Sequence, residues 1–230
     1  MSVPEARAKG KGKGTTIATS HDQGRNAVAK RAVSDTVTGM ETRTPQKLYA
    51  YVDESGQDTS GELFLVSVVV TGEARDGLRK KLRTIERVSG KQAKKWTKAR
   101  LAEHTAYLQS ALQLRELRGC IYYARYHDTR AYVDLMILST AKALHAQGAE
   151  LPQATVIVDG LSRPERPRFA AGLRKLRIRV HKVRGARDQS DELIRLADAI
   201  AGGVRDSLEG DAIMRPLFAQ AERRGVVREI

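Results

Sequence analysis

Cysteine is almost absent from this chain, and aromatic residues are few. A single cysteine among 230 residues, Cys120, excludes both an intramolecular disulfide framework and a cysteine-rich zinc module. No apolar run approaches the roughly 20 residues that cross a bilayer, and the N-terminus lacks the apolar core of a secretory signal. Hydrophobic residues nevertheless make up 41% of the chain, against 5% aromatic, which is enough for a globular core. We therefore expect a cytoplasmic protein that makes no contact with a membrane.

Acidic residues are outnumbered by basic ones, and the excess is unevenly distributed. The 41 Lys and Arg residues against 27 Asp and Glu give a formal net charge of +14. Residues 1–47 carry +5, residues 73–100 carry +8 and residues 163–187 carry +9, so the remaining stretches sum to −8. Segregated positive charge favours a polyanionic partner, namely nucleic acid, whose phosphates the cations would hold. The alternative is that these Lys and Arg residues only solvate exposed helix faces.

The hydrophobic pattern predicts a tail followed by one α/β domain. Residues 1–46 are basic, partly low in complexity and without periodicity, which indicates a disordered tail. Residues 47–230 begin with a hairpin of two strands, continue with a basic helical insert at about 73–114, and then alternate strands with helices. This order predicts a mixed five-stranded sheet flanked by helices, with the insert between the second and third strands. The expected strands cover 48–52, 63–70, 117–126, 154–160 and 178–183, and the helices after the insert cover 129–147, 166–176, 191–208 and 216–223.

Acidic residues stand at the ends of two expected strands and within one expected helix. Asp53 follows the first strand and Asp159 the fourth, and strand ends flank the crevice where α/β sheets bind ligands. Asp191 and Asp198 lie seven residues apart, which places both on one side of a helix that Ser190 is expected to cap. Clustered carboxylates without nearby His or Cys favour a hard divalent ion, Mg²⁺ or Mn²⁺. Two such ions would suit the hydrolysis of a phosphodiester.

Asp198 is the most informative of these acids, because it stands in the apolar stretch Leu-Ala-Asp-Ala-Ile-Ala. A buried carboxylate is normally paired or metal-bound. Small residues around it, among them Gly202, would let the helix approach the sheet closely. The other acids have structural alternatives. Asp53 and Asp159 could each open a turn, and Asp191 could complement the helix dipole.

Three segments carry a resemblance to a known family. Residues 51–56 (Tyr-Val-Asp-Glu-Ser-Gly), 156–160 (Val-Ile-Val-Asp-Gly) and 196–202 (Leu-Ala-Asp-Ala-Ile-Ala-Gly) resemble the signature blocks of the prokaryotic domain of unknown function 3800 family. The resemblance spans roughly residues 47–208. That family is similar to the ribonuclease H-like superfamily, which implies a five-stranded mixed sheet with carboxylates on the first strand, the fourth strand and the last helix.

The resemblance also implies a ligand set and shows one departure. The implied metal ligands are Asp53, Asp159 and Asp198. Either Asp191 or Glu54 would be the fourth. Glu54 would face away from Asp53 if the strand persists. Arg195 stands where many relatives have Gln, and its cation could pair with Asp191 or Asp198 in competition with a metal.

Basic residues beside these acids are candidates for gripping a nucleic acid. Trp96 could stack on a base, although it is as well placed to anchor the insert to the body of the domain. The candidate contacts are Lys80, Lys81, Lys94, Lys95, Trp96, Arg174, Lys175, Arg177, Lys182 and Arg184.

These observations together predict a metal-dependent nuclease that acts on RNA, DNA or a hybrid. Its catalytic carboxylates would be Asp53, Glu54, Asp159, Asp191 and Asp198. The alternative is a nucleic-acid-binding or interaction module that keeps the fold without the chemistry, which Arg195 favours. A phosphatase of another α/β type is disfavoured, because Asp53 lacks a second Asp two residues on. The pattern does not indicate an oligomeric state.

Overall fold

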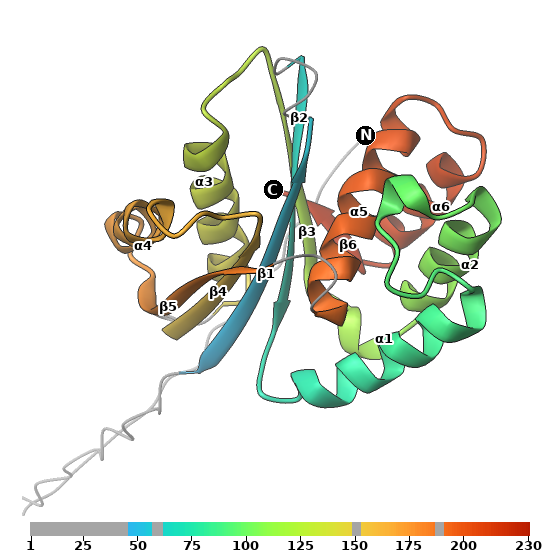
Figure 1. Ribbon diagram of the computed structural model, residues 1–230, viewed down its shortest axis with the longest axis horizontal. Coiled ribbons are helices and arrows are strands. Elements are labelled where there is room, and N and C mark those ends of the chain that lie inside the picture. Colours follow the sequence, from blue (N-terminus) through green and yellow to red (C-terminus); the bar gives the residue numbers. More distant parts are fainter. Residues whose placement is uncertain (1–45, 57–61, 149–152, 187–190) are drawn as a thin grey trace, which may run out of the picture. The chain divides into compact units, whose positions relative to one another are not determined.

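The computed structural model describes residues 46–56, 62–148, 153–186 and 191–230. The tail expected over residues 1–46 lies outside these ranges, apart from its last residue. The described residues form an α/β arrangement in which helices cover both faces of one sheet (Figure 1). None of the helices in these ranges is both long and apolar enough to span a membrane.

The sheet is mixed and has six strands in the order β5-β4-β1-β2-β3-β6. Neighbouring strands β1, β2 and β3 run antiparallel, β4 and β5 continue parallel to β1, and β6 runs parallel to β3. The prediction of five strands was therefore one short. The additional strand is three residues long, too short to display a periodicity of two, and it exists because it pairs with the edge of β3. The strands are β1 (Lys47–Ser55), β2 (Leu63–Thr71), β3 (Ile121–His127), β4 (Gln153–Asp159), β5 (Arg179–Ala186) and β6 (Val227–Glu229).

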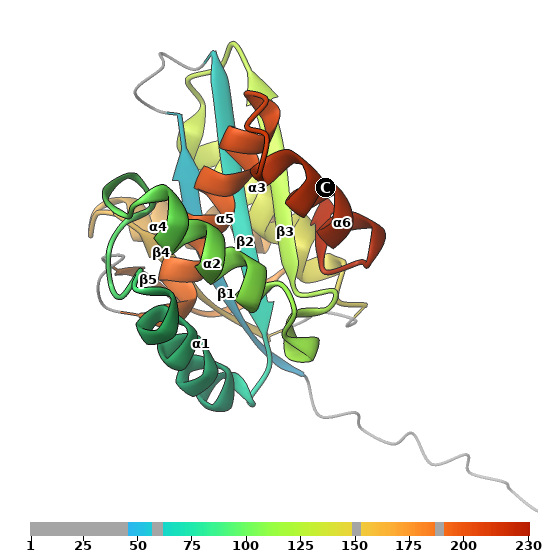
Figure 2. The same ribbon diagram turned by 90° about the vertical axis from the view of Figure 1, so that its right-hand side faces the viewer.

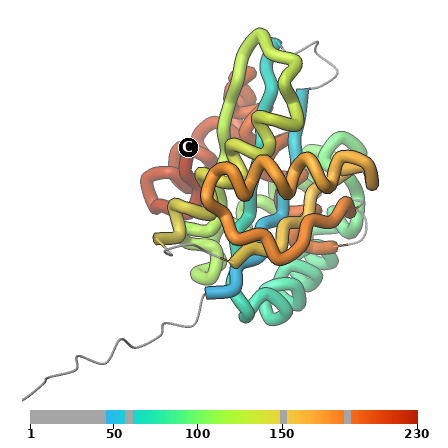
Figure 3. The backbone as a smooth tube through the Cα atoms, turned by 90° about the vertical axis from the view of Figure 1, so that its left-hand side faces the viewer, coloured from blue at the N-terminus to red at the C-terminus, as the bar shows by residue number. Residues whose placement is uncertain are grey.

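Six α-helices form the outer layers. Figures 1 and 3 show α3 and α4 on one face of the sheet, and Figure 2 shows α5 on the other face with α1 and α2 in front of it. Helices α1 and α2, with the short 3-10 helices η1 (Trp96–Lys98) and η2 (Arg115–Leu117), follow β2 and precede β3 in the chain. The α-helices are α1 (Arg75–Ser89), α2 (Leu101–Ala111), α3 (Tyr132–His145), α4 (Glu165–Lys175), α5 (Glu192–Leu208) and α6 (Met214–Arg223).

Each face of the sheet has its own hydrophobic core. Side chains along β1 alternate between the two faces, so Tyr51 belongs to the core under α5 whereas Val52 belongs to the core under α3 and α4. We call these the α5 face and the α3/α4 face. Most residues of α5 are buried, because the sheet covers one side of this helix and the α1–α2 layer covers the other.

Helix α5 is held against both layers by close contacts. The Ser67 hydroxyl of β2 donates a hydrogen bond of 2.6 Å to the backbone carbonyl of Ala197. On the outer side, a Cβ at Gly202 would lie only 2.3 Å from the ring of Trp96. A Cβ at Gly203 would lie 2.7 Å from the ring of Phe218 in α6. A close approach to the sheet was predicted for the small residues of α5. The Ser67 contact shows it at Ala197, whereas Gly202 and Gly203 admit aromatic rings from the outer layer.

Candidate functional site

Asp53 and Asp159 lie on neighbouring parallel strands at the same level of the sheet. Strand β1 extends through Asp53 to Ser55, so Asp53 stands within a strand and opens no turn. The register pairs Val52 with Val158, and the next step along both strands brings Asp53 beside Asp159. Both side chains follow the alternation of Tyr51 and Ile157, whose side chains pack in the core under α5. The two carboxylates therefore share the α5 face.

Asp198 approaches the same point from α5. Asp53 is buried, with 7% of its surface exposed, and its Oδ1 accepts a hydrogen bond of 2.8 Å from the backbone N–H of Glu54. Burial raises the pKa of Asp53 well above its ordinary value, and the negative charges of Asp198 and Asp159 raise it further. Asp53 pairs with Ser67 in the β1–β2 register, and Ser67 bonds the carbonyl of Ala197, the residue before Asp198. Three carboxylates, from β1, β4 and α5, therefore lie in one neighbourhood. We call Asp53, Asp159 and Asp198 the acid cluster.

The acid cluster fits a divalent cation in donor chemistry, but it is not assembled around one. Carboxylate oxygens are the donors that Mg²⁺ and Mn²⁺ prefer, and a buried acid beside two like charges is stabilised by a nearby cation. Within the described ranges, however, no group of three or more His, Cys, Asp or Glu side chains is arranged to hold a metal ion.

The η1 segment orients Asp198. The backbone N–H of Trp96 donates to Asp198 Oδ2 at 2.8 Å, and the indole N–H of the same residue donates to Asp206 Oδ2 at 3.0 Å. The indole also stacks on His104, with ring centroids 4.0 Å apart and an interplanar angle of 7°. Trp96 is 6% exposed, so its ring contacts protein on its faces and offers little surface to a base. The sequence pointed to Trp96 as a possible anchor but gave no sign that it contacts Asp198.

Asp191 is the N-cap of α5, where Ser190 was expected. Its backbone is extended and its side chain accepts a hydrogen bond of 2.8 Å from Leu193 N–H, whereas Ser190 lies outside the described residues. The other oxygen of Asp191 pairs with Arg79 of α1 at 2.6 Å. Arg79 in turn donates to the Tyr51 hydroxyl at 2.8 Å. Both carboxylate oxygens of Asp191 are thus engaged in fixing α1 and the start of α5.

Two further residues predicted near the acids take other positions. Glu54 stands on the opposite face of β1 from Asp53, because the strand continues past both. Arg195 is buried and donates two hydrogen bonds to Glu86 of α1, at 2.6 and 2.8 Å. It also lies 3.6 Å from Glu192. This buried pair joins the insert to α5 on the outer side of the helix.

A groove with basic walls lies on the α5 face beside the acid cluster. Strand β5 pairs Lys182 with Thr155 and Arg184 with Ile157, so these two cations share the face of Asp159. The Arg75 guanidinium lies 3.5 Å above the ring of Tyr49. We call this cavity of about 580 Å³ the basic groove; its lining is Tyr49, Tyr51, Arg75, Arg79, Thr155, Ile157, His181, Lys182, Arg184, Gly185, Ala186 and Asp191.

The charge pattern of the groove differs between its walls. On the α1 wall, Arg79 is paired with Asp191 and Asp76. On the β5 wall, Lys182 and Arg184 are exposed, and their side chains form no hydrogen bond or ion pair with any residue that the structure describes. The β5 wall therefore offers cations to an external anion. Arg75 was not singled out from the sequence, because only the fold brings α1 opposite β5.

The other predicted nucleic-acid contacts are spread over different surfaces. Lys94 pairs with Glu103 at 2.7 Å, and Lys81 pairs with Glu116. Lys80 is exposed on α1. A further group at the C-terminal end of α4 lies on the α3/α4 side and is also exposed; it comprises Arg174, Lys175 and Arg177.

Comparisons with known proteins place the chain near no characterised family. No family model matches it, and no curated protein matches it. Among solved structures, a chain of the PCNA:RNase HII complex from Archaeoglobus fulgidus is 14% identical with a TM-score of 0.46, over 78% of this chain and 90% of that one. Ribonuclease H2 from Pyrococcus horikoshii OT3 is 14% identical with a TM-score of 0.46, over 76% of this chain and 99% of that one. Likenesses this distant do not establish a family or an activity.

Proposed function

We propose that this protein is a divalent-metal-dependent nuclease that hydrolyses phosphodiester bonds in RNA or DNA, on a ribonuclease H-like fold. The observation that carries the proposal is the placement of Asp53 beside Asp159 on parallel strands, with Ser67, opposite Asp53, bonded to the carbonyl before Asp198. These carboxylates come from β1, β4 and α5, and they share a face of the sheet with the basic groove. Acids to hold a metal and cations to hold a phosphate backbone are the two requirements of such an enzyme.

The roles of the residues follow from their positions. Asp53, Asp159 and Asp198 would hold Mg²⁺ or Mn²⁺, and two ions fit the number of carboxylates. The bound metal would supply an activated water and stabilise the charge on the leaving oxygen. Trp96 N–H keeps Asp198 oriented. Asp191 and Glu54 are left out of the ligand set, since the first is engaged with Arg79 and Leu193 N–H and the second faces away.

The substrate would approach along the basic groove. Lys182 and Arg184 form its exposed wall and would contact successive phosphates of one strand, with Arg75 facing them from α1. Trp96 is not part of this contact set, because its ring is buried. The cations at the end of α4 lie on the other side of the sheet and would contact only a longer substrate that wraps around the domain.

A binding module without catalysis is the second candidate. It is favoured by one observation, the lack of any ready-made metal-holding group among the residues that the structure describes. In that case the acid cluster would be structural, and the basic groove would carry the function alone.

A cleavage assay separates the two candidates. Labelled RNA, DNA and hybrid duplex are incubated with the protein in Mg²⁺, Mn²⁺ or EDTA, beside Asp53→Asn and Asp198→Asn. Both variants keep the size of the side chain and one acceptor oxygen, which in Asp198→Asn can still accept from Trp96 N–H. Asp134→Asn is the matched control, since Asp134 is an exposed acid of α3 that pairs with Arg168. Metal-dependent cleavage that both cluster variants lose and the control keeps is expected; salt-sensitive binding without cleavage in any metal would overturn the proposal.

A further inference from the structure

The loop between α1 and α2 brings a lysine to the acid cluster. Lys95 has an extended backbone, with φ −62° and ψ 158°, and stands immediately before η1. The next residue along the chain, Trp96, donates its backbone N–H to Asp198 Oδ2 at 2.8 Å. Lys95 is therefore one residue away from a direct contact with the acid cluster, and its side chain of four methylene groups is long enough to reach it.

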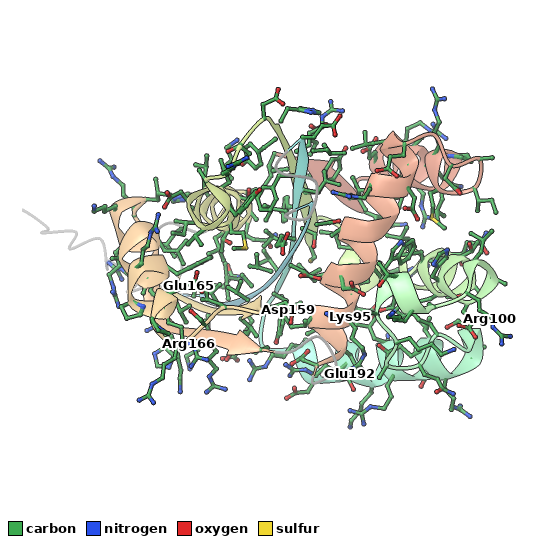
Figure 4. All side chains as sticks on the ribbon, turned by 45° about the horizontal axis from the view of Figure 1, so that its top comes forward. Lys95, Arg100, Asp159, Glu165, Arg166 and Glu192 are labelled. Carbon is green, nitrogen blue, oxygen red and sulfur yellow. The ribbon has the colours of Figure 1, made fainter. Side chains whose placement is uncertain are left out.

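The direction of this side chain agrees with that placement. Figure 4 shows Lys95 beside the first half of α5, on the side that faces Asp159 at the end of β4. Lys95 is exposed, so its ammonium group lies where an incoming substrate can meet it. Other lysines of the loop are placed differently: Lys94 pairs with Glu103, and Lys98 stands at the far end of η1 from Lys95.

A positive charge near the acid cluster would offset the repulsion among its three carboxylates. The negative charges of Asp198 and Asp159 act on buried Asp53, which is costly for all three unless a cation is near. An ammonium is a compact charge on a flexible stem, so it can pair with a carboxylate at one moment and with a phosphate oxygen at another. Among the residues that the structure describes, the three carboxylates do not form a group arranged to hold a metal ion. A lysine whose ammonium pairs with these carboxylates accounts for both observations.

We propose that Lys95 is a catalytic residue of this site: its ammonium balances the acid cluster when no ion is bound, and contacts a non-bridging oxygen of the scissile phosphate when substrate is bound. This inference rests on the proposed nuclease function. In the hydrolysis, a water oxygen bonds to phosphorus and loses one proton to solvent, while one bridging P–O bond breaks and the leaving oxygen takes up a proton from solvent. Lys95 keeps its protons throughout and stabilises the added negative charge of the phosphate.

Two measurements on the full chain test this role. The variants are Lys95→Ala, Lys95→Gln and Lys95→Arg, with Lys98→Ala as the matched control from the same loop. Manganese affinity is measured by calorimetry with MnCl₂ alone, without nucleic acid. Removing a positive charge from beside the ion is expected to tighten Mn²⁺ binding about tenfold in the Ala and Gln variants. The Arg variant keeps the wild-type affinity, because it keeps the charge.

Cleavage at saturating Mn²⁺ supplies the second readout. The Ala and Gln variants are expected to lose about 100-fold in kcat, as when one charge-stabilising donor is removed, and the Arg variant recovers part of the loss. If Lys95→Ala matches Lys98→Ala in both measurements while the wild type binds Mn²⁺ and cleaves, Lys95 has no such role and the nuclease proposal stands. A wild type that neither binds Mn²⁺ nor cleaves overturns both.

Discussion

The two faces of the sheet bury different kinds of residue. On the α3/α4 face, the buried polar side chains of α3 are the hydroxyls of Ser139 and Thr140, which donate to carbonyls of their own helix at 2.8 and 2.7 Å. No charged side chain within the described ranges is buried in the core on that face. On the α5 face and in the layer outside it, the buried residues include Asp53, Glu86 and Arg195.

This difference separates stability from function. Apolar packing stabilises a fold at little electrostatic cost, whereas each buried charge loses hydration and needs a specific partner. The α3/α4 face therefore serves as the scaffold. The charges of the α5 face are costly to retain, and clusters of this kind are typical of sites that bind ions or substrates. Matched substitutions on the two faces can break or sharpen this contrast.

The largest expected effect is on catalysis. Asp198→Asn removes one carboxylate of the acid cluster and keeps the contact with Trp96 N–H. We expect cleavage to fall by about 1,000-fold or more, a loss of the size caused by removing a group that stabilises transition-state charge. Asp134→Asn, an exposed acid of α3, should leave the rate within about twofold of the wild type. Equal losses in both variants would remove the functional distinction between the faces.

Glycines on the two faces give the next largest contrast. Gly202→Ala places a methyl group 2.3 Å from the Trp96 ring, which is held by its stack on His104 and by the indole hydrogen bond to Asp206. We expect it to lower the free energy of unfolding by about 3 kcal/mol. Gly172→Ala meets only the Ile137 side chain at 2.9 Å, which can rotate, so about 1 kcal/mol or less is expected. Urea denaturation measures both; a cost for Gly202→Ala no greater than for Gly172→Ala would show that η1 adapts.

Tyrosines on the two faces should differ in their response to alkaline pH. Burial raises the pKa of Tyr51, in the core under α5, to about 12, whereas the unfolded chain ionises this residue near pH 10. Folding therefore loses stability as the pH rises from 10 to 12, because the unfolded state gives up its proton first. The difference from Tyr51→Phe should amount to about 2 kcal/mol across that range. Tyr122→Phe, in the core of the α3/α4 face, should show a smaller difference. A larger one would contradict the expected contrast between the tyrosines of the two faces.

The smallest expected effect concerns binding by the groove. Replacing Lys182 and Arg184 with Ala should weaken binding of a single strand about tenfold. It should also lower the slope of log affinity against log salt concentration by the contribution of about two phosphate contacts. Replacing Arg174 and Arg177, at the end of α4, removes the same charge from the other side of the sheet. That control should leave the salt dependence nearly unchanged. Fluorescence anisotropy in EDTA measures both pairs without cleavage, and equal slopes for the two would show that the groove has no special part in binding.

Local patterns were enough to predict the central strands and the approximate position of the acids. Strand periodicity placed Asp53 and Asp159 at equivalent points of β1 and β4, and helical spacing placed Asp198 on α5. Their proximity follows from the parallel register of β1 and β4 and from the packing of α5 on β1. Whether they act as metal ligands stays a prediction.

Contacts between distant segments could not be predicted in the same way. The N–H of Trp96 reaches Asp198 across 102 positions of the chain, and Arg79 reaches Asp191 across 112. The basic groove depends on β5 lying opposite α1, which no local pattern encodes. The three-residue strand β6 was missed for the same reason, since it is defined only by its pairing with β3.

Manganese binding to the protein alone tests the central claim most directly, because it requires no knowledge of the substrate. Calorimetric titration with MnCl₂ should show saturable binding to the wild type and to Asp134→Asn. The same titration should show binding weakened at least tenfold in Asp53→Asn and in Asp198→Asn. A wild type that binds no Mn²⁺, or cluster variants that bind it as tightly as the wild type, would contradict the assignment of Asp53, Asp159 and Asp198 as a metal site.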